Sequence, residues 1–229
     1  MKNLRPAVFL VGLLVAASAW PQSKNLAPGF ASLPKGASVV IMPTDIELFS
    51  VSGGGVLEPK ADWTEAASQH FKRALLEKNG VLGLRSIELA EKDADELAEI
   101  NSLHGAVARA IALHHFGSLN LPTKEGKLDW SLGEPVQLIK KKTGADYALF
   151  SWVRDSYAST ERKMAMIALG IFGVVTPGGA QVGYASLVDL NTGQILWFNR
   201  LARASGDLRE ADKAAETVAT LLDGFPIAK

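Results

Sequence analysis

The chain has 229 residues, of which 48% are apolar, and its 24 basic and 24 acidic side chains balance at neutral pH. This length suffices for one sizeable α/β domain or for two small ones. The balanced charge argues against nucleic-acid partners, which favour a basic surface, and against binding to anionic lipid through charge alone. The absence of cysteine excludes disulfides and thiol catalysis.

The first nineteen residues have the pattern of a secretory signal peptide. Lys2 and Arg5 precede an apolar run over 7–17, and small residues close that run. We therefore expect cleavage after Ala19, a mature chain that begins at Trp20 with 22 basic and 24 acidic residues, and a periplasmic or secreted location. The apolar run is too short to span a bilayer, which needs about 20 residues. A lipoprotein would have cysteine after the cleavage point, so we expect no lipid anchor.

The remaining chain divides into an arm and one domain. Proline and glycine recur over 20–36, which predicts an irregular arm. The first expected strand covers 38–42 and ends before Pro43, and the segment 45–51 either extends this strand or begins a loop. We therefore predict a single α/β domain over 37–229.

Capping patterns and apolar periodicity predict the elements that follow. Asp62 with Glu65, and Asp93 with Glu96, have the spacing of capping boxes and each opens a helix. The first helix should end at Asn79-Gly80. A short strand is expected over 86–89, between these two helices. The second helix should bury one stripe of residues: Leu97, Ile100, His104, Val107, Ala108, Ile111 and His115.

The second half of the chain has the clearest strand signals. A third helix is expected over 131–143, and the run 145–157, apolar on both faces at its start, predicts a central strand. Two further strands, over 181–190 and 194–202, flank a hairpin turn, and Asp207 with Glu210 opens a last helix. The resulting order, β-α-β-α-α-β-β-β-α, predicts an α/β fold whose mixed sheet of about five strands has helices packed on it.

The apolar segment Met164 to Val175 is unusual for a connection between two strands. It contains no charged residue for twelve positions and belongs to an insertion over 164–179. Three interpretations remain open: a helix or strand buried in the domain's own core, an apolar flap that contacts a partner or a membrane surface, and a membrane-inserted hairpin of an oligomer. The candidate interface residues are Met164, Met166, Ile167, Leu169, Ile171, Phe172, Val174 and Val175.

No motif in the sequence defines a catalytic, cofactor or metal site. The glycines at 53–55 lack the G-K-[ST] continuation of a phosphate loop. His104 and His115 share a helix face but lie about 16 Å apart, too far to bind one ion together. Asp155 and Asp189, near strand ends, are the carboxylates that a hydrolase would use, although salt bridges and caps explain them more simply. We expect no cofactor and no metal.

Two stretches carry a resemblance to known proteins. Gly144 to Phe150 reads G-A-D-Y-A-L-F, and Tyr184 to Trp197 reads Y-A-S-L-V-D-L-N-T-G-Q-I-L-W. This pattern resembles a group of bacterial envelope domains that includes the curli-secretion channel subunit, the amino-terminal domain of TolB, and outer-membrane lipoproteins that activate penicillin-binding proteins. The resemblance implies a non-enzymatic role in binding or assembly. The missing lipoprotein cysteine departs from many members of the group.

Together these observations predict an exported protein of the bacterial envelope that acts as a non-enzymatic binding or assembly module. We expect an envelope protein or peptide as its partner, with membrane-surface contact or a homo-oligomer as further options, and no nucleic acid. Two alternatives remain at this point: an envelope hydrolase that uses the carboxylates near Asp155 and Asp189, and a subunit of a pore-forming oligomer.

Overall fold

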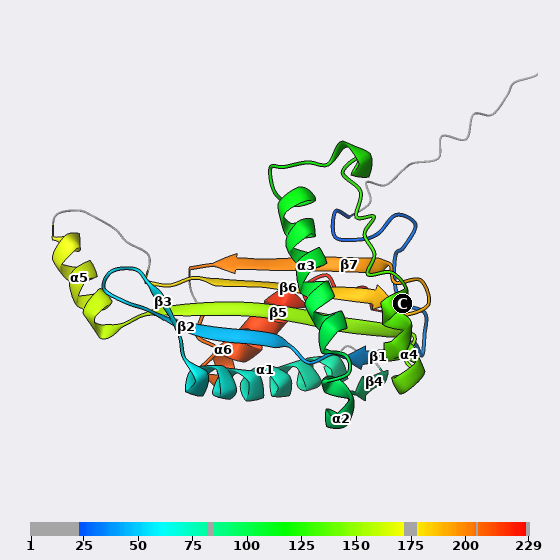
Figure 1. Ribbon diagram of the computed structural model, residues 1–229, viewed down its shortest axis with the longest axis horizontal. Coiled ribbons are helices and arrows are strands. Elements are labelled where there is room, and N and C mark those ends of the chain that lie inside the picture. Colours follow the sequence, from blue (N-terminus) through cyan, green and yellow to red (C-terminus); the bar gives the residue numbers. More distant parts are fainter. Residues whose placement is uncertain (1–22, 82–84, 172–177, 205, 228–229) are drawn as a thin grey trace, which may run out of the picture.

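The computed structural model describes residues 23–81, 85–171, 178–204 and 206–227. The expected signal peptide lies outside these residues. The described chain forms a mixed α/β fold in which a seven-stranded sheet has helices on both faces (Figure 1). The strands are β1 (Ser38–Ile41), β2 (Asp45–Val51), β3 (Leu57–Pro59), β4 (Arg85–Glu88), β5 (Tyr147–Ala158), β6 (Gln181–Asp189) and β7 (Ile195–Arg203).

The long strand β5 organises the sheet. One edge of β5 pairs with β6 along 147–155, and β6 pairs in turn with β7, both antiparallel. The other edge pairs in parallel with two strands in line: β1 along 147–149 and β2 along 152–158. β4 pairs with β1, and β3 with β2, as the outermost strands. The sheet thus has seven strands, whereas the sequence analysis expected about five, because it did not count 45–51 as a separate strand and did not indicate β3.

Pro43 separates β1 from β2, which pair one after the other with the same edge of β5. A proline has no backbone N–H and cannot donate to a sheet, so β1 ends after Ile41 and β2 resumes at Asp45. Across the break, Thr44 and Ser151 place their hydroxyl oxygens 2.7 Å apart. The segment 45–51 thus continues along β5 as a separate strand. Of the two outcomes expected from the sequence, an extended strand or a loop, the structure shows a strand.

Two apolar clusters lie on opposite faces of the sheet. α1 (Ala61–Val81) and α6 (Ala211–Leu221) pack on the face that includes Leu149, Val153 and Leu187. α3 (Ala98–His114) and α4 (Gln137–Thr143) pack on the face that includes Phe150 and Phe198. Alternation along β5 sends successive side chains to the two clusters, so the start of this strand is buried on both faces, as its sequence predicted.

The predicted helices exist, but several boundaries differ. The second helix is split into α2 (Glu91–Ala94) and α3, because the backbone turns at 95–97. The third begins with a short 3-10 turn, Glu134–Val136, and continues as α4 rather than starting at 131. A second 3-10 turn covers Pro122–Lys124. The stripe expected on α3 is confirmed at Ile100, His104, Ala108 and Ile111, all of which are buried.

Two further differences concern elements absent from the predicted order. β3 is a three-residue strand that the sequence pattern did not indicate, and α5 (Thr160–Gly170) occupies the start of the apolar insertion. The tryptophans Trp152 and Trp197 belong to β5 and β7, with β6 between them, and Trp197 is buried in the opposite cluster from the face that Trp152 joins.

Candidate contact surface

α5 is held firmly at its base although it does not pack into the core. Ser159 ends β5 by donating its N–H to Val51 O at 2.9 Å, and its hydroxyl then accepts from Arg162 N at 3.2 Å as the helix N-cap. The returning chain is tied to β5 as well, because Ser156 and Ala180 exchange backbone and hydroxyl hydrogen bonds. The sequence therefore builds a rigid attachment for a helix outside the layered core.

The return path also requires a glycine. A Cβ on Gly179 would lie 1.9 Å from the carbonyl oxygen of Ser156, a contact that no side chain tolerates. Close approach of two backbones is one of the uses that only glycine serves. The Gly178-Gly179 pair in the sequence thus brings the chain back against β5 immediately after the insertion.

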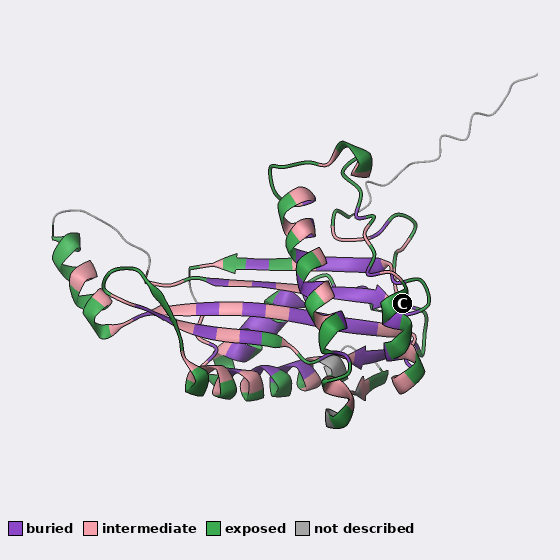
Figure 2. Cartoon of the chain, in the orientation of Figure 1, coloured by how far each residue is buried: buried purple, intermediate pink, exposed green. Residues whose placement is uncertain are grey.

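None of the described residues of α5 is buried (Figure 2). The side chains of Met164 and Ile167 are each 65% exposed, Leu169 is 42% exposed, and Ile171, just after the helix, is 80% exposed. Met166 turns inward, where its methyl carbon would lie 3.5 Å from a Cβ on Gly178. The interpretation of this segment as part of the domain's own core is therefore wrong for the described residues. Phe172, Val174 and Val175 lie outside them.

The loop between β2 and β3 adds to the same surface. Val56 is 63% exposed and Leu57 is 54% exposed. This loop and α5 lie at the same end of the sheet, and a Cβ on Gly53 would be 3.8 Å from Glu161 Cβ (Figure 1). Six of the ten exposed large apolar side chains in the described chain gather here. We call this set the apolar tip: Val56, Leu57, Met164, Ile167, Leu169 and Ile171.

The sequence analysis identified four of these six residues. It did not identify Val56 and Leu57, which follow three glycines. The signal was present as two consecutive apolar residues at a turn. What the sequence did not indicate was that the turn would lie against a helix more than 100 positions later, which depends on the parallel pairing of β2 with β5.

The carboxylates considered for hydrolysis do not come together. Asp189 pairs in register with Tyr147, at the opposite end of β5 from Asp155, a separation of eight residues along the strand or about 27 Å. Asp189 accepts from Asn191 N at 2.7 Å and so stabilises the hairpin turn. Two carboxylates at opposite ends of a strand do not act on one bond.

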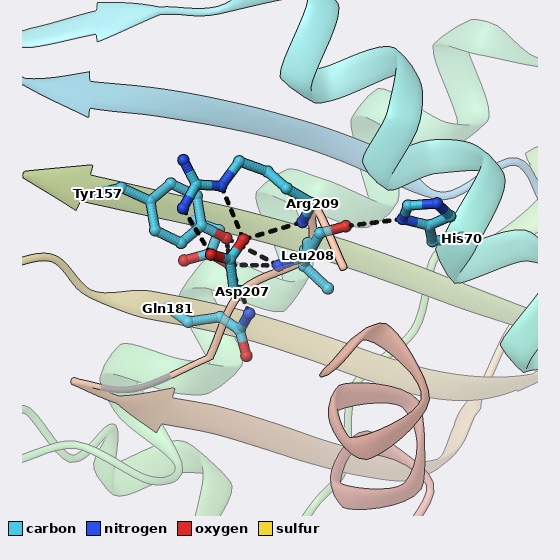
Figure 3. A network of polar contacts seen from close by, with 7 residues as sticks. His70, Tyr157, Gln181, Asp207, Leu208 and Arg209 are labelled. Carbon is cyan, nitrogen blue, oxygen red and sulfur yellow. Dashed lines mark hydrogen bonds and ion pairs between the residues drawn. The ribbon is translucent and has the colours of Figure 1, made fainter. Parts of the chain in front are cut away.

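Asp155 itself belongs to a polar network with Tyr157, Gln181 and Leu208, and Figure 3 labels these three partners. Its Oδ2 accepts from the Tyr157 hydroxyl, from Gln181 Nε2 at 2.6 Å and from Leu208 N at 3.4 Å. Desolvation raises the pKa of the Asp155 carboxyl, and these donors oppose that rise. Burial and the Asp155 contact likewise raise the pKa of the Tyr157 hydroxyl.

This network fixes the connection between β7 and α6. Leu208 N also donates to the Tyr157 hydroxyl at 2.8 Å, and Arg209 places its guanidinium 3.9 Å from the Tyr157 ring centre while pairing with Asp207. Asp207 does not cap α6 as its spacing suggested, since α6 begins at Ala211 without a side-chain cap. The side chains named here bond to one another and to the backbone of Leu208, so the network stabilises the fold.

Two depressions lie in the surface that the structure describes. One, of about 310 Å³, contains Asp155 as its carboxylate, and its Arg154 is already paired with Asp45; the other residues that line it are Phe49, Leu57, Ser156, Ala180 and Val182. Another, of about 240 Å³, lies at the break between β1 and β2. Both are small or shallow next to the closed sites of roughly 300–1,000 Å³ that bind ligands.

The four histidines each have a hydrogen-bond partner. His104 is 1% exposed and shares a 2.5 Å hydrogen bond with the Ser186 hydroxyl, while its ring stacks on Phe150. Burial lowers the pKa of His104 from 6.5 to about 3. The other three contact carbonyl oxygens, those of Leu208 (His70), Leu119 (His114) and Lys24 (His115). Among the described residues, no group of three or more metal-ligating side chains gathers.

The described helices also bear on the membrane-inserted alternatives. Within the ranges that the structure covers, no helix has both the length and the apolar content that crossing a bilayer requires. The apolar tip lies at the surface, at one end of the sheet.

Comparison with known proteins gives distant similarity of fold. No protein-family model matches the chain, and no curated protein matches it. Among solved structures, the PelC dodecamer from Paraburkholderia phytofirmans is 12% identical with a TM-score of 0.39, covering 87% of this chain and 94% of that one. The LpoB C-terminal domain from Escherichia coli is 14% identical with a TM-score of 0.31, covering 78% and 88%.

A lipoprotein from Neisseria meningitidis is 13% identical, with a TM-score of 0.30 and coverage of 74% of this chain and 81% of that chain. One of these three structures is named as a lipoprotein, and none of them is a curli-channel subunit. Similarity at this level assigns no family, partner or activity to the chain.

Proposed function

We propose that this chain is an exported contact module of the bacterial envelope, and that the apolar tip is its interface. The observation that carries the proposal is the exposure of six large apolar side chains at one end of an otherwise well-buried fold. Soluble chains rarely leave a contiguous apolar surface uncovered unless it binds something. The rigid attachment of α5 supports the same reading, since an interface benefits from a preorganised position.

A non-enzymatic role fits the distribution of polar groups. The buried carboxylate Asp155 and the buried histidine His104 are both engaged in hydrogen bonds within the core. Asp155 lines the same depression as Leu57 of the apolar tip, and its carboxylate is held there by donors of the fold. A chain whose titratable core groups stabilise packing, and whose unusual surface is apolar, is better suited to binding than to bond cleavage.

The test is site-specific crosslinking in the intact envelope. A photo-crosslinking residue at Ala168, on the exposed side of α5, should give defined crosslinked species in the wild-type background. Adding Ile167→Asp should remove these species, because a carboxylate at the interface has to be desolvated on contact. The matched control is Leu138→Asp, which places the same charge at an exposed leucine on α4.

The circular dichroism spectrum and the thermal midpoint of Ile167→Asp should equal those of the wild type. If Ile167→Asp leaves the crosslinked species unchanged, or if both aspartate variants remove them equally, the tip is not the interface and the proposal is wrong.

A further inference from the structure

The shape and size of the apolar tip indicate what it contacts. Its exposed side chains come from two places: the eleven-residue helix α5 with Ile171 just after it, and the β2–β3 turn with Leu57 at the start of β3. Both project beyond the layered part of the molecule (Figure 1). Stable protein interfaces use about 20–30 residues on each side. The apolar tip is therefore too small to hold a second copy of this chain by itself.

The charges beside the tip give no basis for an electrostatic partner. Glu161, Arg162 and Lys163 form the first turn of α5, and Lys60 pairs with Glu58 on β3 at 3.5 Å. Acidic and basic side chains thus nearly balance around the apolar residues. A surface of this kind is attracted by apolar burial and not by an oppositely charged patch.

A lipid surface meets both conditions. The acyl boundary of a bilayer accepts a small projecting shape without a complementary groove, and apolar side chains that enter it are buried by roughly 5–10 Å. α5 is about 16 Å long, which matches a helix lying along the surface rather than one that crosses it. The polar first turn of α5 suits the headgroup layer.

We infer that the apolar tip inserts shallowly into the acyl boundary of a lipid bilayer and tethers the folded sheet to a membrane surface. This inference rests on the proposed function, since it names the partner of the same surface. It makes a specific demand on lipid chemistry. Binding should occur on zwitterionic lipid, should not need anionic headgroups, and should resist salt, because apolar burial drives it.

The experiment is co-flotation of the purified exported chain with phosphatidylcholine vesicles, with and without phosphatidylglycerol, at low and high salt. The wild type should float with both vesicle types at both salt concentrations. Ile167→Asp should lower the vesicle-bound to free ratio by about tenfold or more, whereas Leu138→Asp should leave it unchanged. Both variants keep the same N-terminus, so their difference isolates the tip.

A second measurement reports the inserted residue directly. The chain has no cysteine, so Ala168→Cys introduces a single site for an environment-sensitive dye. Its emission should shift to the blue on addition of phosphatidylcholine vesicles, and the same dye at Leu138→Cys should not shift.

The outcomes separate the two proposals. A wild-type chain that floats with no vesicle overturns the lipid inference, and so does binding that requires phosphatidylglycerol and disappears in salt. If crosslinking at Ala168 is nevertheless lost in Ile167→Asp, the contact function stands and the tip binds a protein groove. If Ile167→Asp changes neither flotation nor crosslinking, both proposals fail.

Discussion

The two ends of the sheet differ in how far their apolar side chains are buried. At the end near β1, helices cover both faces and side chains such as Phe150 and Val188 are completely buried. At the other end the same strand, β5, leads into a helix with no buried residue. Burial of large side chains stabilises the first end, whereas the second contributes little to folding and leaves apolar area available. The comparison shows that one continuous strand can serve stability and contact in separate halves.

Between these ends lies a half-covered zone. From Trp152 to Ser156, the residues of β5 that face the α3 side are only partly buried, while Val153 on the other face stays buried. Trp152 compensates by stacking on Tyr184 with ring centres 5.0 Å apart, and Arg154 lies 4.6 Å from the Trp152 ring centre. The stacked rings of Trp152 and Tyr184, with Arg154, thus cover this part of the sheet, where no helix does.

The largest expected effect tests the covered end. Phe150→Ala removes a fully buried ring from the cluster under α3 and should lower the free energy of unfolding by about 3–5 kcal/mol. Ile167→Ala, a truncation at the tip, should change it by less than about 0.5 kcal/mol. Urea denaturation followed by circular dichroism measures both. Equal losses in the two variants would show that the tip is part of the cooperative core.

The second prediction sharpens the comparison through pH. In the fold, the pKa of His104 is lowered to about 3, so the folded state binds fewer protons than the unfolded state below the unfolded pKa of 6.5. Stability from this group is therefore present above pH 6.5 and is lost as pH falls toward 3, by about 1.4 kcal/mol for each pH unit within this window.

Replacing the ring isolates this contribution. His104→Gln should make unfolding less dependent on pH between 6.5 and 3, although it lowers stability at neutral pH by disturbing the stack on Phe150. The pKa of Asp146 is lowered, chiefly by its hydrogen bond from Ser38, so a residual loss of stability at low pH should remain in the variant. An unchanged slope after the substitution would contradict the burial of a neutral imidazole.

The smallest prediction concerns the network between the two ends. Tyr157→Phe removes a hydroxyl that donates to Asp155 and accepts from Leu208 N, and it should cost about 1–2 kcal/mol. Tyr184→Phe is the matched control, because its hydroxyl makes no hydrogen bond that the described residues show, and it should change stability by less than about 0.5 kcal/mol. Chemical denaturation at pH 7 compares the pair. If Tyr184→Phe lost more free energy of unfolding than Tyr157→Phe, the Tyr157 hydroxyl would not be the stabilising group.

Much of the layered fold was predictable from local pattern. The apolar run that became β5, and the Asn191-Thr192-Gly193 turn between β6 and β7, are short-range signals that packing reinforced. Helix starts were less predictable. Asp207 fits a capping pattern, yet it pairs with Arg209, whose guanidinium also lies over the partly buried Tyr157 ring. Such competition depends on tertiary neighbours, which a local pattern does not contain.

The candidate surface was half predictable for a similar reason. An uncharged run from Met164 to Ile171 indicates that something unusual lies there, but composition does not distinguish a core helix from an exposed one. The distinction comes from where β5 ends relative to α1 and α6, which is a property of the whole sheet. Val56 and Leu57 join the surface only because β2 runs parallel to β5 and delivers their loop to the same place.

The unbroken path of β5 has a mechanical consequence. Twelve residues of extended chain span about 40 Å, from the layered end to the base of α5. β5 is held along this path by β1 and β2 on one edge and by β6 on the other. A molecule that pulls on α5 along the strand axis would load these ladders in shear, so that many bonds share the tension at once. Under such a load, β5 would transmit the tension from α5 to the layered end of the sheet.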